Sequence, residues 1–379
     1  MKIALLSYST RPRGGVVHTL HLAEALAALG EDVTVWTLGR GGDTGFFRPV
    51  SPAVRLRIVP FADGPADETV GRRVLRSIAT LRDAFDPAPY DIVHAQDCIS
   101  ANAVGPCVRT VHHIDHFTTP ELAACHERAI VEPYAHVCVS TAVAGELREG
   151  WGLTAEVIPN GVAYDRFAAT DPTARASWRS SLGRYLLTVG GIEPRKGSLD
   201  LLEAYALLRA DHPGVRLVIA GGETLFDYRD YRTRWAARAA ELGVEPVVLG
   251  PVPDSDLPAL VAAADAFAFP SRKEGFGLAA MEALAAGVPL VVRDLPVLRE
   301  VFGPAARFAT TPAQLAAGLG HALTAEDPAR RAAGRELAAA HTWPEAARRH
   351  VALYRSLSGR RRSPGSSSRR AGRDRRRSP

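Results

Sequence analysis

The sequence predicts an α/β protein made of two doubly wound domains with parallel sheets. Apolar runs of strand length alternate with segments of helical period along most of the 379 residues, and this alternation is typical of βαβ units. The alternation is interrupted once, where Pro159 and the pair Asn160-Gly161 are turn signals. The length also suffices for two hydrophobic cores of roughly 150 residues each. We therefore expect two domains of similar size that face each other across a cleft.

The expected elements follow one another in two series. In the first series the strands are short apolar runs near Ile3–Tyr8, Val33–Thr37, Arg55–Val59, Ile92–Ala95, Val108–His112 and Val137–Ser140, with helices near Val16–Leu29, Thr69–Phe85 and Thr141–Gly150. In the second series the strands lie near Tyr185–Val189, Arg216–Ala220, Pro246–Leu249, Ala266–Phe269 and Pro289–Val292, with helices near Ser198–Asp211, Arg229–Leu242, Asp256–Ala264 and Gly277–Ala286. Ligands of such sheets bind beyond the carboxyl ends of the strands, so we expect the functional residues in the loops that follow strands.

The charged residues are unevenly distributed along the chain. The 46 basic and 41 acidic residues give a formal net charge of +5, but residues 359–379 hold nine arginines and one aspartate, so the rest of the chain has a net charge of −3. We expect this Arg-rich tail to be disordered, because Arg, Ser, Pro and Gly cannot form a core. It would suit peripheral contact with an anionic membrane, and we expect no nucleic-acid partner. Arginine outnumbers lysine 43 to 3, so compositional bias also explains the tail.

No apolar stretch reaches the roughly 18 to 20 residues that a membrane-spanning helix needs. The first residues run from Met1 to Tyr8 and continue into Arg11 without a small-residue cleavage site, which favours a buried strand over a signal peptide. We expect a cytoplasmic protein, at most peripheral at the inner membrane face. The cysteines lack CxxC spacing and a secretory context, which favours reduced thiols in the core at Cys98, Cys107, Cys125 and Cys138.

The stretch from Pro270 to Pro289 carries the most chemical information. It predicts a strand end, a glycine-rich loop, a helix and the next strand. Gly275 and Gly277 allow backbone amides to approach a ligand, and the helix that begins near Gly277 would direct its positive end at an anion such as a diphosphate. Glu282 lies in an otherwise small and apolar segment, where an unpaired carboxylate is costly to bury. A pair of sugar hydroxyls is one candidate partner for this carboxylate.

On the residues alone, a purely structural role is an equal alternative for both glutamates of this stretch. Glu274 lies at the lip of the loop, where it can pair with Arg272 or Lys273 at the surface. Glu282 can simply complement the positive dipole of the helix start.

This stretch resembles the nucleotide-sugar signature of retaining GT-B glycosyltransferases of the family 4 type (glycosyl transferases group 1). In that family two glutamates eight residues apart flank a glycine-rich loop and a helix start, and Glu274 and Glu282 match them. The resemblance implies that Glu274 contacts hydroxyls of the transferred sugar and Glu282 the ribose of the nucleotide. Further matches occur in the family's order over residues 1 to about 355, at Gly14-Gly15, His112, Val157–Val162, Arg166-Phe167 and Gly190–Gly197.

The resemblance also implies a division of the chain. Residues 1–160 would form the acceptor-binding domain and residues 161–342 the nucleotide-sugar donor domain, both Rossmann-like, with a last helix near 343–357 that crosses back onto the first domain. The donor-binding residues that it implies are Gly14, Gly15, Gly191, Gly275, Phe276, Gly277, Leu278 and Glu282.

Two cations precede a predicted helix in the loop after the first strand of the second series. Arg195 and Lys196 would neutralise a diphosphate leaving group as its negative charge develops, although a solvated pair is the alternative. The chain has only three lysines, and Lys196 and Lys273 both flank the predicted site, which favours a specific role for a compact ammonium. The resemblance implies that Lys196 binds the diphosphate. Many relatives have an arginine directly after the first glycine of this motif; this chain has Gly191 there, and we hypothesise that Arg195 replaces that charge.

Three histidines and a carboxylate lie within residues 112–116. This cluster invites a metal interpretation, but neighbouring strand residues point to opposite faces and no second cluster with ligand spacing follows, so we expect no metal site. The resemblance implies that His112 contacts the donor sugar. His113 and Asp115 would lie on the acceptor side, as would His94, although each of them also fits a role in holding its loop.

The segment Asp254-Ser255-Asp256 superficially matches the DxD metal motif of the other large glycosyltransferase fold. It precedes an apolar helical segment, and we interpret it as a helix cap. We therefore expect a mechanism that requires no metal and no other cofactor.

The sequence thus predicts a retaining glycosyltransferase that moves a hexosyl group from a nucleotide diphosphate sugar to an unidentified acceptor, which is a glycolipid, a polysaccharide or a small molecule. Its catalytic residues would be His112, Glu274, Arg195 and Lys196. The resemblance implies front-face attack in which the leaving phosphate helps to take the acceptor proton. The alternatives are an epimerase or a phosphorylase on the same fold, or a non-catalytic nucleotide-sugar-binding protein.

Overall fold

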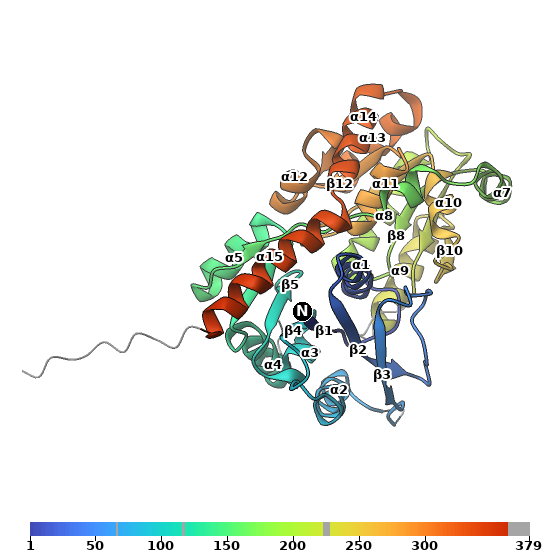
Figure 1. Ribbon diagram of the computed structural model, residues 1–379. Helices are drawn as coiled ribbons and strands as arrows, with labels where there is room; N and C mark the ends of the chain where they lie inside the picture. The colour runs from blue at the N-terminus through green and yellow to red at the C-terminus, as the bar shows by residue number, and fades with distance from the viewer. Residues whose placement is uncertain (66, 116, 118, 223–227, 363–379) are drawn as a thin grey trace, which may run out of the picture.

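The computed structural model describes residues 1–362 except 66, 116, 118 and 223–227. Its two halves each contain one sheet with helices packed around it (Figure 1). Every pair of neighbouring strands in both sheets is parallel. The predicted α/β class with two doubly wound sheets is confirmed.

The first half holds a seven-stranded sheet in the order β3-β2-β1-β4-β5-β6-β7. Its strands are β1 (Lys2–Leu6), β2 (Asp32–Arg40), β3 (Arg55–Phe61), β4 (Ile92–Ala95), β5 (Val108–Val111), β6 (Ala135–Cys138) and β7 (Glu156–Val157). The connecting helices are α1 (Gly14–Ala28), α2 (Val70–Ala84), α3 (Cys98–Val104), α4 (Pro120–Val131) and α5 (Thr141–Trp151). The strand order reverses between β1 and β4, and ligands of doubly wound sheets bind outside such reversal points.

The second half holds a six-stranded sheet in the order β10-β9-β8-β11-β12-β13. Its strands are β8 (Arg184–Val189), β9 (Val215–Ala220), β10 (Val247–Gly250), β11 (Ala266–Phe269), β12 (Leu290–Arg293) and β13 (Ala306–Ala309). Its helices include η1 (Pro194–Lys196), α8 (Ser198–Leu208), α9 (Arg229–Glu241), α10 (Leu257–Ala262), α11 (Leu278–Ala285), α12 (Pro296–Phe302), α13 (Pro312–Thr324) and α14 (Pro328–Ala340), and α6 (Tyr164–Ala168) and α7 (Pro172–Leu182) precede its first strand. The order of this sheet reverses between β8 and β11.

The last helix, α15 (Trp343–Arg362), packs on α1 of the first half. Trp343, Ala347 and Tyr354 are buried in the same apolar cluster as residues of the first sheet. Just before this helix, Val162 pairs with Thr342 in an isolated parallel bridge, so the segment that leaves the first half meets the segment that returns to it. A side chain at Gly161 would overlap the backbone of Trp343, and the Cβ–Cα distance would be only 2.7 Å.

Helix α15 is longer than expected and reaches Arg362. Residues 359–362 are therefore helical, which corrects the prediction that the disordered tail begins at 359; Pro364 is the first proline after this helix, so the sequence contains no earlier helix breaker. Residues 363–379, which make up the rest of the predicted tail, lie outside the described residues.

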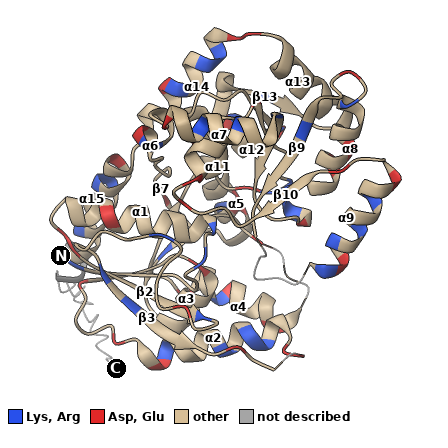
Figure 2. Cartoon of the chain, turned by 90° about the vertical axis from the view of Figure 1, so that its right-hand side faces the viewer, with Lys and Arg blue, Asp and Glu red and all other residues tan. Residues whose placement is uncertain are grey.

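Charged side chains lie on the outer helices, and arginines outnumber acidic residues along α9 and α14 (Figure 2). No helix within the described part of the chain is long and apolar enough to cross a membrane. All four cysteines are free; Cys107, Cys125 and Cys138 are buried and Cys98 is half-buried. The prediction of reduced core thiols therefore fits the structure for these three and, in part, for Cys98.

Candidate active site

The site lies where the loops at the two strand reversals approach each other. The loop after β8 contains Arg195 and Lys196, and the loop after β11 contains Glu274 and Gly275. These two loops are joined by a backbone hydrogen bond of 2.7 Å from the amide of Arg272 to the carbonyl oxygen of Arg195. Two loops that are distant in sequence are thus fixed as one surface.

His112 lies between the two halves of the molecule. It follows β5, and its carbonyl oxygen lies so close to Gly275 of the second half that a side chain at that glycine would overlap it. The same hypothetical Cβ would be 3.3 Å from a methyl group of Val139, while the imidazole of His112 lies 3.7 Å from the place of a Cβ on Gly15. His112 therefore contacts both the start of α1 and the glycine-rich loop.

The His112 imidazole is electrically neutral. Burial, followed by the nearby His18 and Arg109, holds its pKa well below the usual value of 6.5. Its Nε2 atom is buried and has no hydrogen-bond partner among the described residues. A buried nitrogen without a partner carries a free-energy cost that a ligand hydroxyl would relieve.

The carboxylate of Glu274 is bound by two cations. Its Oε1 atom accepts hydrogen bonds from Lys196 Nζ at 2.5 Å and from Arg195 Nη1 at 3.1 Å. Burial alone would raise the pKa of Glu274, but Lys196 and Arg195 outweigh it and lower the pKa to about 2. Arg195 also donates to Glu193 at 3.1 Å. Glu274 is therefore ionised at any physiological pH and faces both predicted leaving-group cations.

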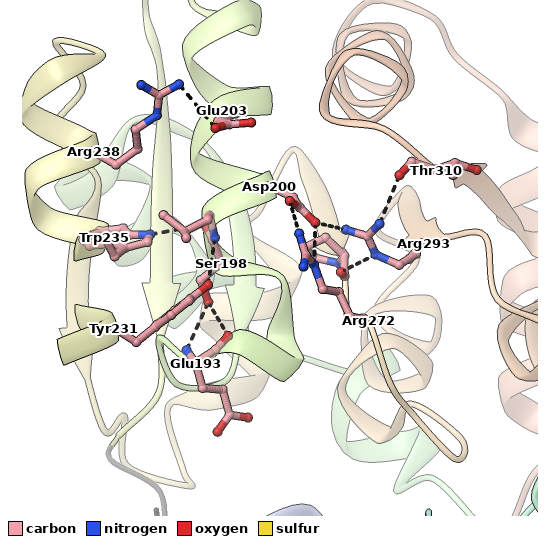
Figure 3. A network of polar contacts seen from close by, with 12 residues as sticks. Glu193, Ser198, Asp200, Glu203, Tyr231, Trp235, Arg238, Arg272, Arg293 and Thr310 are labelled. Carbon is pink, nitrogen blue, oxygen red and sulfur yellow. Dashed lines mark hydrogen bonds and ion pairs between the residues drawn. The ribbon is translucent and has the colours of Figure 1, made fainter. Parts of the chain in front are cut away.

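A second network holds these cations in place (Figure 3). Asp200 in the first turn of α8 accepts hydrogen bonds from Arg272 at 2.7 Å and from Arg293. Arg293 Nε also donates to the carbonyl oxygen of Pro270 at 2.9 Å. The backbone of Gly197 adopts φ +65° and lies against Pro270, where no side chain would fit. The start of α8 and the end of β11 are thus tied together beside Lys196.

Glu282 is half-buried, and its carboxyl has no side-chain hydrogen bond or ion pair among the described residues. Burial raises its pKa to about 8; nearby Arg166 lowers the pKa and nearby Asp254 raises it. Arg166 itself is bound to Asp254 at 2.8 Å, so its charge is already compensated. An uncompensated acid of this kind is frequent at functional sites.

Several residues of the glycine-rich loop pack in the protein interior. Gly277 has φ +99°, and a Cβ there would be 3.1 Å from the ring of Phe302. The Phe276 side chain is buried in the core of the second half, so only its backbone is available to a donor. Leu278, the first residue of α11, packs against the cores of both halves.

The other glycines implied by the resemblance lie at the same junction. Gly14 and Gly15 form the first turn of α1, and no atom lies within 4 Å of the place of a Cβ on Gly14. Gly191 is half-buried in the loop between β8 and η1. Backbone amides at the start of α1 are therefore free of side-chain cover at Gly14.

On the acceptor side the structure separates the predicted residues. His113 and Asp115 form an ion pair of 3.1 Å. Burial raises the pKa of Asp115, but His113, Lys273 and Arg195 outweigh it, so the pKa of Asp115 is lowered. His94 is instead in the core: it is fully buried and bound to Tyr354 at 2.6 Å and Thr110 at 2.7 Å. The expectation that His94 lies at the acceptor site is wrong, because it occupies an inward position of β4 under α15.

The Asp254-Ser255-Asp256 segment does not cap its helix with a side chain. Asp256 is at the N-cap position of α10 without a side-chain hydrogen bond to the helix, and Asp254 binds Arg166 instead. The helix-cap interpretation is therefore wrong at the level of the side chains. Within the described part of the chain, no group of three or more His, Cys, Asp or Glu side chains is arranged to hold a metal, and His116 lies outside that part.

Sequence reasoning missed Glu193, Asp200 and Arg293. Asp200 lies two residues after the predicted helix start, where an acidic residue is ordinary. Its pairing with Arg272 and Arg293 depends on strands that are neighbours only in space. No local spacing signals such a contact.

Two parallel sheets joined at their strand reversals, with cations and a carboxylate from the two loops of the second sheet, define a glycosyltransferase of the GT-B class. A family model described as Glycosyl transferases group 1 matches residues 172–336, and one described as Glycosyltransferase Family 4 matches residues 12–166. The chain belongs to the group 1 glycosyltransferases, and it is an enzyme of that class.

Curated relatives support this assignment over most of the chain. Glycogen synthase of Mycobacterium tuberculosis (strain H37Rv) is 30% identical over 345 residues, which cover 79% of this chain and 80% of that protein. Phosphatidyl-myo-inositol mannosyltransferase of Mycolicibacterium smegmatis is 29% identical over 394 residues, which cover 95% of each.

Solved structures share the fold at lower identity. Sucrose-phosphate synthase from Thermosynechococcus elongatus aligns with a TM-score of 0.77 at 20% identity and covers 95% of this chain and 99% of that one. HepE from Anabaena, in complex with UDP and glucose, aligns with a TM-score of 0.71 at 21% identity and covers 94% and 100%.

Proposed function

We propose that the chain is a retaining glycosyltransferase that moves a hexosyl group from a nucleotide diphosphate sugar to an acceptor bound mainly by its first half. The observation that carries this proposal is the group formed by Glu274, Lys196 and Arg195 beside His112. Lysine has three hydrogen-bond donors and arginine five. Arg195 and Lys196 use only some of these on Glu274, Glu193 and the Lys273 carbonyl oxygen, so both retain donors for a diphosphate.

Each remaining part of the donor has a partner in this arrangement. Glu274 and the unpartnered Nε2 of His112 would bind hydroxyls of the transferred sugar. The backbone amides at Gly14, Gly15 and the start of α11 would face the phosphates. The half-buried carboxyl of Glu282 would accept hydrogen bonds from the ribose hydroxyls, which is a natural role for a carboxyl that has no other partner.

The chemistry follows from the placement of charge. The bond between the sugar C1 and the diphosphate oxygen breaks while the acceptor oxygen bonds C1 from the same face, and the acceptor proton passes to the leaving phosphate. Arg195 and Lys196 stabilise the negative charge that develops on that phosphate. We propose that a metal is not essential, because these two cations supply the charge that a metal would otherwise supply; unchanged turnover after treatment with a chelator is the expected result.

Structural neighbours and curated relatives support a nucleotide-sugar donor. HepE was solved with UDP and with UDP-glucose, and a trehalose-6-phosphate enzyme from E. coli with UDP-2-fluoro glucose. Mannosyltransferases are among the curated relatives. These names support a hexosyl donor and leave its nucleotide to experiment.

The first experiment is a thermal-shift screen of the wild type, Glu282→Ala and the surface control Glu203→Ala against UDP, GDP, ADP and TDP. A ligand that binds only the native state raises its stability by mass action. We expect one nucleotide to raise the Tm of the wild type and of Glu203→Ala but not of Glu282→Ala. No shift with any nucleotide at saturating concentration would contradict the proposed donor site. NMR of the product then tests whether the transferred sugar retains its anomeric configuration. A product of inverted configuration would contradict the retaining mechanism.

A further inference from the structure

A group of aromatic and cationic side chains lies at the other strand reversal, in the first half. Tyr8 follows β1 and Arg40 ends β2, while Arg13 lies just before α1. Arg13 Nη1 donates to the Tyr8 hydroxyl at 2.9 Å, and Arg40 Nε donates to the Tyr8 carbonyl oxygen at 3.4 Å. Both guanidinium groups lie over the Tyr8 ring, at 5.6 Å and 5.7 Å from its centroid. We refer to Tyr8, Arg13 and Arg40 as the Tyr8 cluster.

The positive charge of the Tyr8 cluster is not balanced. Within the described part of the chain, neither Arg13 nor Arg40 forms an ion pair with a carboxylate; Arg40 donates to the hydroxyl of Ser77 at 2.8 Å. Arg13 Nε is buried without a hydrogen-bond partner. Burial, followed by the like charges of Arg73 and Arg13, lowers the pKa of Arg40 to about 10. Two guanidinium groups that lie over one ring and have no carboxylate partner favour an anion beside them.

The carboxylates near the cluster are already in use. Glu68, which interacts with Arg40, forms an ion pair of 2.8 Å with Arg76. Asp97 accepts from the backbone amides of Tyr8 at 2.9 Å and Ser100 at 2.8 Å, where it caps α3. Burial raises the pKa of Asp97. The cluster is therefore a cationic site whose neighbouring carboxylates are bound to other groups.

We propose that the Tyr8 cluster binds a phosphate group of the acceptor. A guanidinium presents a planar fork that binds phosphate oxygens in pairs, and Arg13 and Arg40 can approach one phosphate from the start of α1 and the end of β2. This inference rests on the proposed function, because it names the substrate class for the acceptor side of the same site.

The position of the cluster fits an acceptor that reaches the reaction centre. β1 and β5 are both neighbours of β4 in the sheet, so Tyr8 and His112 follow strands that are two spacings, roughly 10 Å, apart. Gln96, which directly follows β4 between them, is buried, and both its amide oxygen and nitrogen lack hydrogen-bond partners among the described residues. It is suited to bind a hydroxyl of the ring that carries the phosphate.

A phosphate of this kind comes from one of two sources, a free sugar or polyol phosphate, or the headgroup of a phospholipid. The test uses both. The full chain is first saturated with the nucleoside diphosphate found in the thermal-shift screen, so that Arg195 and Lys196 are occupied. It is then titrated calorimetrically with inorganic phosphate, glucose 6-phosphate and glucose, and sedimented with vesicles of equal parts phosphatidylinositol and phosphatidylcholine or of phosphatidylcholine alone.

The variants are Arg40→Gln, Arg13→Gln and the matched control Arg57→Gln, which changes an exposed arginine of β3. We expect glucose 6-phosphate to bind the wild type at least 10-fold more tightly than glucose, and each of the first two variants to lose about 10- to 100-fold of that affinity. Arg57→Gln should bind like the wild type. If instead only the phosphatidylinositol vesicles depend on Arg13 and Arg40, the phosphate belongs to a lipid headgroup.

The proposal is overturned if neither the soluble phosphates nor the phosphatidylinositol vesicles bind in a manner that depends on Arg13 and Arg40. Nucleotide affinity is measured in the same variants and should not change, so failure of the donor site and failure of the phosphate site give different results. If no nucleotide binds, the phosphate titration is repeated with Lys196→Met, which removes a competing cation. Circular dichroism confirms that each variant is folded.

Discussion

The carbonyl oxygen of His112 lies directly against the Cα of Gly275, across the junction of the two halves. This contact joins the end of β5 to the loop that holds Glu274. Because the backbones themselves touch, residue 275 must lack a side chain for the two halves to approach in this way. The relative placement of His112 and the cation group thus depends on one missing methyl group.

Replacement of that glycine tests the contact. We expect Gly275→Ala to lower kcat/KM about 100-fold, because a displacement of the order of 1 Å misaligns reacting groups, and to destabilise the protein by about 1–3 kcal/mol. Steady-state turnover and urea unfolding measure the two effects. Gly145→Ala, in helix α5 with open space around the new Cβ, is the control and should leave activity unchanged. Wild-type activity in Gly275→Ala would show that the contact is not needed for catalysis.

The ammonium of Lys196 is expected to act in the leaving-group step. Lys196→Met keeps most of the side-chain volume and removes the charge, so we expect kcat to fall about 10²- to 10³-fold with a folded protein. Single-turnover kinetics measures the loss. Lys2→Met makes the same change at an exposed lysine and should have no effect. A rise in KM with an unchanged kcat would contradict a role in the transition state.

Glu282 makes stability depend on pH between about 4.5 and 8. Its pKa is raised from 4.5 to about 8, so between these values the native state holds a proton that the unfolded chain releases. The free energy of unfolding should therefore fall as the pH rises from 4.5 to 8, by at most about 1.4 kcal/mol per pH unit. Glu282→Gln should remove this slope, so that the variant equals the wild type near pH 4.5 and exceeds it at pH 8. Urea unfolding at several pH values measures it, and parallel curves for both proteins would rule out the assignment.

Buried histidines predict the opposite dependence in acid. His18 and His350 are fully buried, and burial lowers their pKa values to about 3 and about 4. Below pH 6.5 the unfolded chain binds protons that the native state does not, so stability is lost as the pH falls from 6.5 towards 4. His350→Gln should reduce the slope of the unfolding free energy against pH by at most about 1.4 kcal/mol per pH unit, which is the contribution of one proton. His321→Gln, at an exposed position of α13, should leave the slope unchanged; a variant that retains the full slope would refute the contribution of His350.

The sequence predicted the parts of the site that depend on local order. Glu274, Gly275 and Gly277 lie in one loop after a strand, and the alternation of elements was sufficient to place that loop at the edge of a sheet. Glu282 was recognised as an unusual carboxyl by its apolar neighbours, and the structure leaves it without a partner. These conclusions need only the period of helices and strands and the cost of burying charge.

Other features depend on contacts between distant segments, and the sequence did not reveal them. His94 is expected on the acceptor side, but α15 covers it and Tyr354 binds it. Strand β7 has only two residues, Glu156 and Val157, and its pairing with β6 gives no periodic signal. The Tyr8 cluster also depends on the neighbourhood of β1 and β2 in space.

The return of the last helix to the first half has a consequence for synthesis on the ribosome. The core of the first half includes Trp343, Val351 and Tyr354, which are among the last described residues to be translated. Part of the apolar surface of the first half therefore stays exposed while the ribosome synthesises the whole second half. A nascent chain that stops before residue 343 should bind chaperones that recognise exposed apolar segments, and it should release them only when the final helix has emerged from the exit tunnel.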